Sequence, residues 1–257
     1  MKSKLFSLEG RVIALTGGYG WLGVAIAKGL ASHGGRVFIL GRDRERFEAA
    51  FGDPSVQFVE CDLEQSSSID AAFATVTKIG GGLNVVINNA FYCRGSDPEA
   101  ISDADWAYSI DGTLGTVHRG IRASIPYLKK QSDSRIINVA SIYGLVSPNF
   151  SIYEKYPQQK SPPFYGAAKA AVIQLTRYYA VLLGPYGINV NCVTPGAFPS
   201  KKTQSNAEFI AAIGAKTPLA RIGQPEELQG PFVFLSSRAA SYVTGHNLVV
   251  DGGWTAW

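Results

Sequence analysis

The stretch Thr16-Gly17-Gly18-Tyr19-Gly20-Trp21-Leu22-Gly23 decides the fold of this chain. It follows a short apolar run, residues 11–15, and leads into residues 20–32, which have the apolar spacing of a helix. Glycine allows tight turning and close backbone approach, and a helix N-terminus presents free N–H groups. A strand, a glycine-rich turn and a helix in this order predict a site for the diphosphate of a dinucleotide. The alternative is an ordinary strand-to-helix turn.

Short apolar runs with the length of buried strands recur along the whole chain, and segments with helical spacing separate them. Continuously apolar strands are typical of a parallel sheet that is covered on both faces. The alternation therefore predicts an α/β fold, a Rossmann-like doubly wound parallel sheet in a three-layer α/β/α sandwich. Ligands of such sheets bind beyond the carboxyl ends of the strands, at the switch point. The expected strands are residues 12–15, 37–40, 56–59, 83–87, 135–139, 188–192 and 247–250, and the expected helices are residues 20–32, 66–78, 104–130, 165–183 and 225–236.

Length and composition describe one globular domain. The 257 residues are 46% hydrophobic and 17% charged, with no long Gly/Ser or Pro tract and no visible repeat. We therefore expect a single domain over residues 1–257. Residues 1–10 lack the apolar run of a signal peptide, and no run approaches membrane-spanning length. These features predict a soluble, cytoplasmic protein that does not associate with membranes.

Charge and metal-binding residue types exclude further classes of partner. The net charge is +4, and the Lys and Arg residues are not gathered in one run. Nucleic-acid binding is therefore not expected, whereas an anionic small molecule is compatible. Cys61, Cys93 and Cys192 are odd in number and widely spaced, which is typical of reduced thiols. The three histidines are equally scattered, and we predict no metal site.

The run Tyr165-Gly166-Ala167-Ala168-Lys169 places a phenol and an ammonium four residues apart. Side chains at this spacing share one face of a helix. A free tyrosine has a pKa of about 10, and a fixed positive charge beside it favours the phenolate and lowers that pKa. Such a pair can move a proton to or from a carbonyl oxygen.

A second pair, Tyr156 and Lys160, has the same spacing and competes with this choice. Pro157 is compatible only with the first turn of a helix, and the prolines at 162 and 163 would end any helix that began there. Tyr165 instead opens a long helical run. We therefore choose Tyr165 and its partner Lys169.

Several short motifs occur in a consistent order along nearly the whole chain. They are residues 16–23, Cys61-Asp62-Leu63, Asn88-Asn89-Ala90, Ser141, Tyr165 with Lys169, Pro195-Gly196, Thr244-Gly245 and Asp251-Gly252-Gly253. In this order the motifs resemble the short-chain dehydrogenase/reductase family. The resemblance implies an NAD(P)-dependent oxidoreductase that interconverts a secondary alcohol and a carbonyl, acts on a small molecule and assembles as a homodimer or homotetramer.

The resemblance also implies roles for single residues. Tyr165 would exchange a proton with the substrate oxygen, and Ser141 would orient that oxygen. Lys169 would lower the pKa of Tyr165 and hydrogen-bond the nicotinamide ribose. From the residues alone, Ser141 is more simply a loop or N-cap serine. Among the other matches, Asp62 and Leu63 would border the adenine, Asn89 and Ala90 would line the cofactor cleft, and Pro195 and Gly196 would lie near the nicotinamide.

A fourth catalytic position departs from the family. Members usually carry an Asn on the long central helix, where it supports a water-linked proton path to the Lys. Counting from Trp106 places Thr113 at that position, and Asp111 is the alternative if the helix is offset. A hydroxyl can hold a water, so we expect a working relay through Thr113. If Thr113 only packs between helices, its replacement by Val should leave turnover intact.

The cofactor-binding residues show two further departures. Most family members of this length have glycine at the position of Trp21. After the predicted strand at 37–40, Gly41 occupies the position of the acid that contacts the ribose of NAD, and Arg42 follows it. A guanidinium suits the 2'-phosphate, so NADP(H) is favoured, while Asp43 leaves NAD(H) open. The expected cofactor-binding residues are Gly17, Gly20, Trp21, Leu22, Gly23, Arg42, Asp62, Leu63, Asn89, Ala90, Tyr165, Lys169, Pro195 and Gly196.

The segment between Ser141 and Tyr165 is longer than in most relatives, with an insertion at about residues 145–163. Because both flanks are catalytic, we expect it to hang over the cleft, where its aromatic and polar side chains suit a sugar, sugar acid or other polyol-like substrate. A surface excursion that packs on a neighbouring subunit is the alternative. Residues 141–144 and 150–154 also resemble short-chain oxidoreductases of bacterial glycan pathways. The side chains in question are Tyr143, Asn149, Phe150, Tyr153, Glu154 and Lys155.

Two other functions fit the same motifs. One is a reductase of acyl-linked or other small carbonyls, because the fold does not fix the substrate. The other is a catalytically silent homologue that binds the nucleotide without turnover. The joint presence of Ser141, Tyr165 and Lys169 argues against the second function, and the departure at Thr113 leaves it open.

Overall fold

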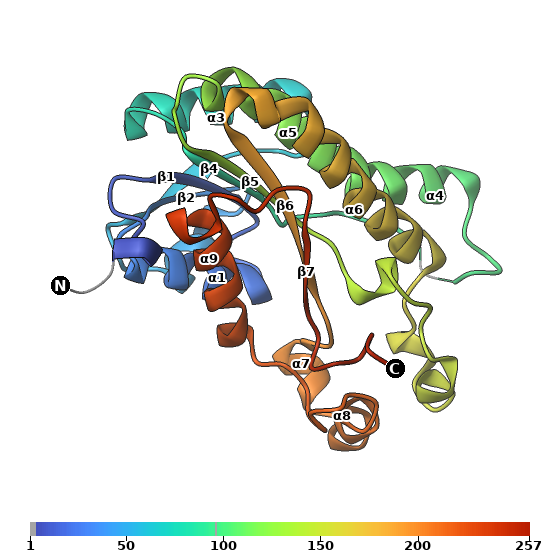
Figure 1. Ribbon diagram of the computed structural model, residues 1–257. Coiled ribbons are helices and arrows are strands. Elements are labelled where there is room, and N and C mark those ends of the chain that lie inside the picture. Colours follow the sequence, from blue (N-terminus) through green and yellow to red (C-terminus); the bar gives the residue numbers. More distant parts are fainter. Residues whose placement is uncertain (1–3, 96) are drawn as a thin grey trace.

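A single parallel sheet organises the protein. The computed structural model describes residues 4–95 and 97–257, and its seven strands lie in the order β3-β2-β1-β4-β5-β6-β7, all parallel (Figure 1). The predicted doubly wound α/β fold is confirmed. The strands are β1 (Val12–Thr16), β2 (Arg36–Gly41), β3 (Val56–Glu60), β4 (Val85–Asn88), β5 (Ser134–Val139), β6 (Ile188–Pro195) and β7 (Asn247–Val250).

The strand order reverses at β1, whose neighbours are β2 and β4. The chain runs outward from β1 to β3, and then it returns to β4 and runs outward to β7 on the other side. The loops that follow β1 and β4 therefore leave the same edge in opposite directions. This geometry opens a crevice beyond the carboxyl ends of the central strands.

Apolar side chains alternate between the two faces of the sheet. In β1, Ile13 packs in one buried cluster with α1 (Trp21–Ser32) and α9 (Gln229–Ser236), and Ala14 packs in a second cluster on the opposite face. Strands of this kind must be apolar on both sides, which explains their unbroken hydrophobic runs. The opposite face is covered by α3 (Ser66–Gly80), α5 (Thr116–Leu128) and α6 (Pro163–Leu183) (Figure 1).

The long helix expected over residues 104–130 is interrupted. α4 (Asp103–Ile110) passes through a π-helical turn, Asp111–Gly115, into α5. The backbone N–H of Thr116 donates to the Asp111 carbonyl, five residues back, which defines the wider turn. Gly112 sits where a Cβ would lie 2.0 Å from the Tyr92 carbonyl oxygen, so the turn also needs glycine for close contact with the strand loop beside it.

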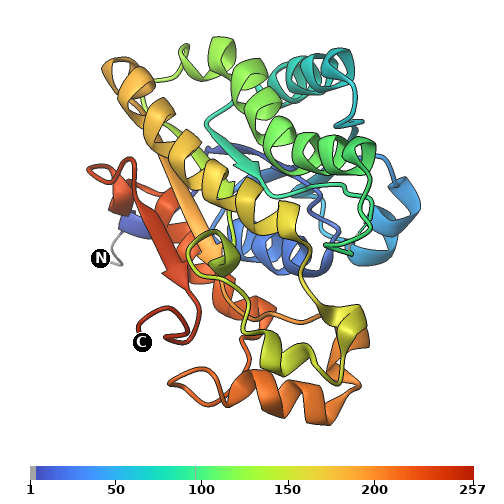
Figure 2. The ribbon, with the colours of Figure 1, turned by 90° about the vertical axis from the view of Figure 1, so that its right-hand side faces the viewer.

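Three helices were not expected from the sequence. They are α2 (Arg44–Ala50), α7 (Lys201–Gln204) and α8 (Ala207–Gly214). All three are short, and short helices give too few turns for an apolar period to stand out. Figure 2 shows α7 and α8 beside the 3₁₀ turns of residues 150–159, beyond the carboxyl edge of the sheet.

These segments form a small lobe, here called the substrate-side lobe and defined as residues 145–163 and 197–220. Its core contains Ile152, Tyr153, Phe209 and Ile213, which are buried together. Lys155 and Glu208 form an exposed ion pair at 3.0 Å across it. The insertion therefore packs on α8 of its own chain.

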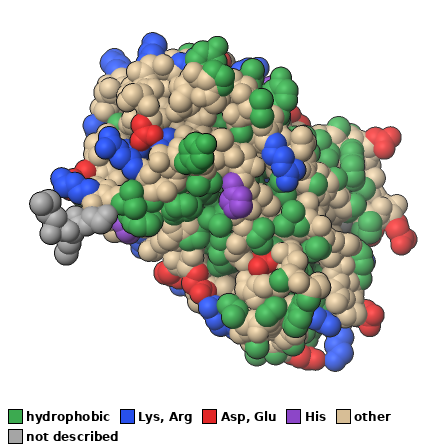
Figure 3. Space-filling model, in the orientation of Figure 1, with side chains coloured by type: hydrophobic (Ala, Val, Ile, Leu, Met, Phe, Trp, Pro, Cys, Tyr) green, Lys and Arg blue, Asp and Glu red, His purple; other side chains and the backbone are tan. Residues whose placement is uncertain are grey.

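Charged groups do not concentrate on the face seen in Figure 3. Lys and Arg side chains are dispersed there among hydrophobic and uncharged surface. No helix among the described residues combines the length and hydropathy that a membrane crossing requires. Cys61, Cys93 and Cys192 are free thiols, and the described part of the chain contains no cluster of three or more His, Cys, Asp or Glu side chains that could hold a metal.

Candidate active site

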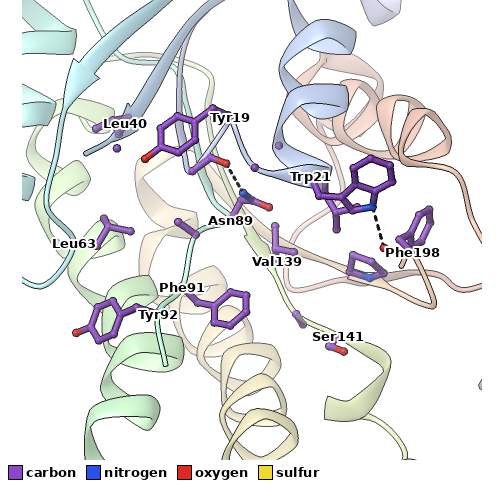
Figure 4. Close-up of a pocket in the computed structure, with 18 of the residues that line it drawn as sticks. Tyr19, Trp21, Leu40, Leu63, Asn89, Phe91, Tyr92, Val139, Ser141 and Phe198 are labelled. Atoms are coloured by element: carbon purple, nitrogen blue, oxygen red, sulfur yellow. Dashed lines mark hydrogen bonds between the residues drawn. The ribbon is translucent and has the colours of Figure 1, made fainter. Parts of the chain in front are cut away.

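A cleft of about 550 Å³ lies at the crevice between the ends of the central strands (Figure 4). All of the residues that the sequence analysis assigned to cofactor binding line this one cleft, and Ser141 lines it with them. The remaining lining residues were not among those that the sequence analysis assigned to cofactor binding or catalysis. They are Tyr19, Leu40, Gly41, Arg46, Cys61, Phe91, Tyr92, Val139, Ala140 and Phe198.

The glycines of the first turn are required by close backbone contacts. Gly17 has φ +63°, and a Cβ on it would lie 2.7 Å from the Ala90 Cβ. A Cβ on Gly23 would lie 2.5 Å from the Gly17 carbonyl oxygen. Helix α1 begins after Gly20, and no side chain caps its N-terminus. The first N–H groups of a twelve-residue helix therefore face the cleft without a side-chain acceptor.

Thr16 joins the two loops that border the switch point. Its hydroxyl oxygen accepts hydrogen bonds from the backbone N–H groups of Asn89, at 2.9 Å, and Ala90, at 3.0 Å. The Asn89 side-chain amide donates in return to the Thr16 carbonyl oxygen at 3.0 Å and to the Gly17 carbonyl oxygen at 3.3 Å, and Figure 4 shows the second of these bonds. Strand β4 thus delivers Asn89 and Ala90 to a fixed place beside the glycine turn.

The far end of the cleft carries two arginines, Arg42 and Arg46. Tyr19 reaches over from the glycine turn, and its hydroxyl accepts from the backbone N–H groups of Arg42 and Asp43. Gly41 is needed here because a Cβ on it would lie 2.5 Å from the Tyr19 ring. The position where an acid would contact a ribose is therefore occupied by a tyrosine ring.

Arg42 and Asp43 have different environments. The Arg42 side chain is 62% exposed, and its guanidinium pairs with Glu64 at 3.1 Å. Asp43 does not line the cleft, because its carboxylate caps α2 by accepting from the Arg46 N–H at 2.9 Å. The sequence analysis did not assign Arg46 to the cleft. An arginine one helical turn after Asp43 is recognisable in the sequence as a second positive charge near this end of the cleft.

Tyr165, Ser141 and Lys169 meet at the other end of the cleft. Tyr165 lies in the first turn of α6, and Ser141 follows β5 and caps the turn Ile142–Gly144. The Ser141 side chain lies close enough to Tyr165 to act on the pKa of the phenol. Lys169, one helical turn further along α6, is buried and donates to the Val139 carbonyl oxygen at 2.7 Å. Phe91 packs on both residues, with its ring 5.5 Å from the Tyr165 ring and 5.4 Å from the Lys169 ammonium.

The electrostatics of this group differ from the sequence expectation. Burial raises the pKa of Tyr165, the nearby Ser141 side chain acts in the opposite direction, and Cys93 adds to the increase. Burial also lowers the pKa of Lys169 to about 8. The expected net lowering of the Tyr165 pKa by Lys169 is not found, because the ammonium is directed at a backbone carbonyl and the phenol is desolvated.

Thr113 lies outside the cleft, in the π-helical turn. Its side chain is fully buried, and its hydroxyl has no hydrogen-bond partner among the described residues. The alternative, Asp111, is engaged elsewhere. Its carboxylate pairs with Arg119 at 2.7 Å and accepts from the Tyr92 hydroxyl.

The competing pair, Tyr156 and Lys160, is not brought to the cleft. The Tyr156 ring packs edge-on against Phe209 at 5.0 Å, inside the substrate-side lobe. The Lys160 ammonium lies 5.8 Å from the Phe150 ring. Neither residue shares a helix with the other, because Pro157 begins only a short 3₁₀ turn.

The insertion at residues 145–163 does not line the main cleft. This corrects the expectation that the insertion hangs over the cleft. Residues from it instead line a second cleft of about 470 Å³ on the outer side of α6. The Tyr143 and Tyr153 hydroxyls bond to each other, and Lys155 pairs with Glu208. The side chains of Tyr143, Tyr153 and Lys155, which were expected to contact a sugar, therefore stabilise the substrate-side lobe instead.

An uncapped helix N-terminus at the switch point, in one cleft with a Ser, Tyr and Lys group, defines a dinucleotide-dependent oxidoreductase of the doubly wound class. Comparison with known proteins gives the family. The family described as enoyl-(acyl carrier protein) reductase matches residues 21–255. The chain belongs to the short-chain dehydrogenase/reductase family, and it is an NAD(P)-dependent oxidoreductase.

Two curated relatives span nearly the whole chain. A rhamnolipids biosynthesis 3-oxoacyl-[acyl-carrier-protein] reductase of Pseudomonas aeruginosa is 31% identical over 96% of this chain and 97% of its own length. A gluconate 5-dehydrogenase of Gluconobacter oxydans is 31% identical over 98% of this chain and 97% of its own. The two relatives carry different substrate names at the same level of identity.

Two solved structures agree with this fold. A Pseudomonas aeruginosa RhlG/NADP active-site complex has a TM-score of 0.85 and 31% identity, and the match covers 98% of this chain and 99% of that one. A gluconate 5-dehydrogenase from Burkholderia cenocepacia J2315, in complex with NADP and tartrate, has a TM-score of 0.86 and 26% identity. That match covers 99% of this chain and 98% of the other.

Proposed function

We propose that this protein uses NADP(H) to interconvert a secondary alcohol and a carbonyl on a sugar, a sugar acid or another polyol-like substrate, with NAD(H) as the alternative cofactor. The single observation that carries the proposal is that Ser141, Tyr165 and Lys169 line the same cleft as the glycine turn. Proton transfer and dinucleotide binding would then occur in one site.

The residues present fit a dinucleotide. The Gly17 and Gly23 contacts leave no room for a Cβ, and the uncapped start of α1 offers N–H donors to a diphosphate. Arg42 and Arg46 would give positive charge to a 2'-phosphate, which supports NADP(H). Asp62 and Leu63 would border the adenine, and Asn89, Ala90, Pro195 and Gly196 would line the path toward the nicotinamide.

The bound nicotinamide supplies or accepts the hydride. Tyr165 holds its proton because burial raises its pKa, so in reduction it would donate that proton to the carbonyl oxygen. Ser141, which lines the cleft together with Tyr165, would bond the same oxygen and orient it. The Lys169 ammonium would stabilise the phenolate that remains after donation. In oxidation the proton would move in the opposite direction.

A buried hydroxyl supports a proton path behind Lys169. Thr113 Oγ1 has no protein partner among the described residues, and a buried polar group without a partner is costly unless water satisfies it. We propose that Thr113 holds a water that links Lys169 to solvent. Asp111 is less suitable because Arg119 and Tyr92 occupy its carboxylate.

Two observations support a polyhydroxylated substrate. The relatives include a protein named gluconate 5-dehydrogenase and an Escherichia coli protein named 5-keto-D-gluconate 5-reductase, 32% identical over 97% of both chains. The ring of Phe91 lines the cleft against Tyr165, where it could stack on the apolar face of a sugar, and Tyr92 lines the same cleft.

A second candidate function is the reduction of acyl-linked carbonyls. It is favoured by the Pseudomonas aeruginosa relative, whose name specifies a 3-oxoacyl-[acyl-carrier-protein] substrate. The aromatic lining of the cleft would suit an acyl chain as well as a sugar. Activity on one substrate class and not on the other separates the two candidates.

We propose that the protein is a cytoplasmic homodimer or homotetramer. Helix α6 carries Tyr178, Val181 and Leu182 on an exposed stripe, and Val181 is 81% exposed. Large apolar side chains at this spacing favour burial against a second copy. Light scattering on the purified protein measures the subunit number directly.

The function is tested in two steps. NADPH and NADH are first titrated into the protein by fluorescence, which measures cofactor binding and preference. A panel of keto-sugar acids, polyols and 3-oxoacyl thioesters is then assayed by nicotinamide absorbance. We expect tighter binding of NADPH and turnover on a keto-sugar acid. Dinucleotide binding without turnover on any member of the panel would favour the silent homologue.

A further inference from the structure

One side-chain hydrogen bond links two segments of the chain that both line the main cleft. The indole Nε1 of Trp21 donates to the Phe198 carbonyl oxygen at 3.1 Å (Figure 4). Trp21 is the first residue of α1, beside the glycine turn, and Phe198 belongs to the segment that leaves β6. Both residues line the cleft, and the bond is partly buried.

The segment that receives this bond is held at its other points by backbone contacts. The Gly196 N–H donates to the Val250 carbonyl oxygen, and the Ala197 carbonyl oxygen accepts from the Gly223 N–H, both at 2.9 Å. Beyond Phe198, the Pro199 carbonyl oxygen accepts from the Gln204 side chain. Residues 196–200 therefore form a short strap that follows β6, and Trp21 is attached near its middle.

The Phe198 ring fixes the position of the strap. It packs against Gly223 so closely that a Cβ there would lie 2.4 Å from the ring. The carbonyl oxygen of the same residue accepts the hydrogen bond from the Trp21 indole. A glycine at position 21 has no side-chain donor and could not make this link.

We propose that Trp21 is a positioning residue that ties the strap, residues 196–200, across the dinucleotide cleft. The bond then has to break before a bound dinucleotide can leave, and Pro195 and Gly196 are held beside the nicotinamide end while it is intact. This inference rests on the proposed function, because it concerns release of the dinucleotide from that same cleft.

The expected effect follows from the strength of one hydrogen bond. A bond of this type contributes about 1 kcal/mol, so its loss should speed dinucleotide release about five-fold. Trp21→Phe removes the N–H donor and keeps an aromatic ring. Gly223→Ala should weaken the same Trp21–Phe198 hydrogen bond, because the added Cβ would displace the Phe198 ring.

The test is a stopped-flow chase of bound NADPH with excess NADP⁺, which measures the release rate directly. We expect Trp21→Phe and Gly223→Ala each to release NADPH about five-fold faster than the wild type. Trp106→Phe makes the same chemical change on α4, far from the strap, and should release NADPH at the wild-type rate.

The outcomes separate this inference from the proposed function. If the wild type binds NADPH and Trp21→Phe releases it at the same rate, the role of Trp21 is refuted and the proposed function stands. If the wild type binds no dinucleotide, both fail. Should Trp21→Phe not fold, Gly223→Ala decides the question alone, and an unchanged release rate in that variant also refutes the inference.

Discussion

The glycine turn with its neighbouring strand loops and the substrate-side lobe are built in different ways. The turn depends on close backbone contacts that glycine alone permits. At Gly23, for example, a Cβ would lie only 2.5 Å from the Gly17 carbonyl oxygen. In the lobe, the defining contacts join residues far apart in the sequence. Lys155 pairs with Glu208 over 53 positions, and Tyr156 packs on Phe209.

We interpret this difference as a division of roles, in which the turn binds the cofactor and the lobe selects the substrate. The turn uses backbone N–H groups and close contacts, which leave little freedom for side-chain variation. The lobe uses side chains that other family members need not share. Tyr165 lies between the two regions, since the glycine turn lines its cleft, and Ser141, in the same cleft, leads into the lobe.

The largest expected effect comes from Tyr165→Phe, which removes the proton donor at the border of the two regions. Turnover should fall by about 10²- to 10⁴-fold, the usual contribution of a general acid. NADPH affinity should stay at the wild-type value, because the change leaves the turn intact. Steady-state kinetics and a fluorescence titration measure the two quantities.

Tyr156→Phe is the matched control for that substitution. It removes the same hydroxyl from the competing tyrosine, which packs on Phe209 and does not line the cleft. Turnover near the wild-type rate is expected. The assignment would have to move to Tyr156 if this variant lost activity while Tyr165→Phe retained it.

Gly23→Ala tests the turn alone and should have the next largest effect. The added Cβ would meet backbone atoms that cannot move aside easily, and overpacking of this kind costs about 1–3 kcal/mol. Dinucleotide affinity should therefore fall roughly 5- to 150-fold. Calorimetric titration with NADPH gives the affinity.

Gly230→Ala is the control for the turn. Nothing lies within 4 Å of a Cβ at this helical position, so the substitution should leave affinity unchanged and stabilise the protein by about 0.5–1 kcal/mol. Equal NADPH affinity in Gly23→Ala and the wild type would contradict the assignment of the turn to the diphosphate.

The pH dependence of reduction probes Lys169. Its pKa is lowered to about 8 by burial, so it is cationic below that pH and neutral above it. The cation stabilises the phenolate left by Tyr165. The rate of reduction should therefore be level below pH 8 and should fall about tenfold per pH unit above it, as expected for loss of one proton.

A pH–rate profile measured on both sides of pH 8 checks this prediction. Tyr165 should not limit reduction in the same range, because its pKa is raised and the phenol stays protonated there. A reduction rate that increases through pH 8 would contradict the proposed role of Lys169.

The smallest expected effect belongs to the substrate-side lobe. Tyr153→Phe removes the hydroxyl that bonds to Tyr143, a bond worth about 0.5–1.5 kcal/mol. The KM for the carbonyl substrate should rise roughly 2- to 10-fold with NADPH affinity unchanged. Tyr242→Phe, at a fully exposed position, is the control. If Tyr153→Phe changed the NADPH affinity and left the KM for the carbonyl substrate unchanged, the separate roles of the two regions would be contradicted.

The same comparison explains what could be predicted from the sequence. The strands, the glycine turn and the choice of Tyr165 over Tyr156 follow from local rules, namely apolar runs, glycine spacing and the position of Pro157. The resemblance to the family also predicted residues that come together in one cleft, including Pro195 and Gly196. Each of these signals lies within a few residues of the feature that it determines.

Apart from the short helices and Arg46, the errors concern contacts between distant segments. The insertion was expected over the cleft, but Phe209 of α8 draws Tyr153 and Tyr156 into the lobe. The π-helical turn before α5 depends on the approach of Tyr92 to Gly112, which no periodicity encodes. The direction of the Tyr165 pKa shift depends on burial, a property of the assembled cleft.

The central claim is that one cleft holds the nicotinamide dinucleotide beside Tyr165. A crystal structure of the protein with NADPH tests it most directly. The account predicts the diphosphate at the N-terminus of α1 and the nicotinamide ring next to the Tyr165 hydroxyl and Ser141. A dinucleotide bound elsewhere, or one bound in the cleft with its nicotinamide remote from Tyr165, would contradict it.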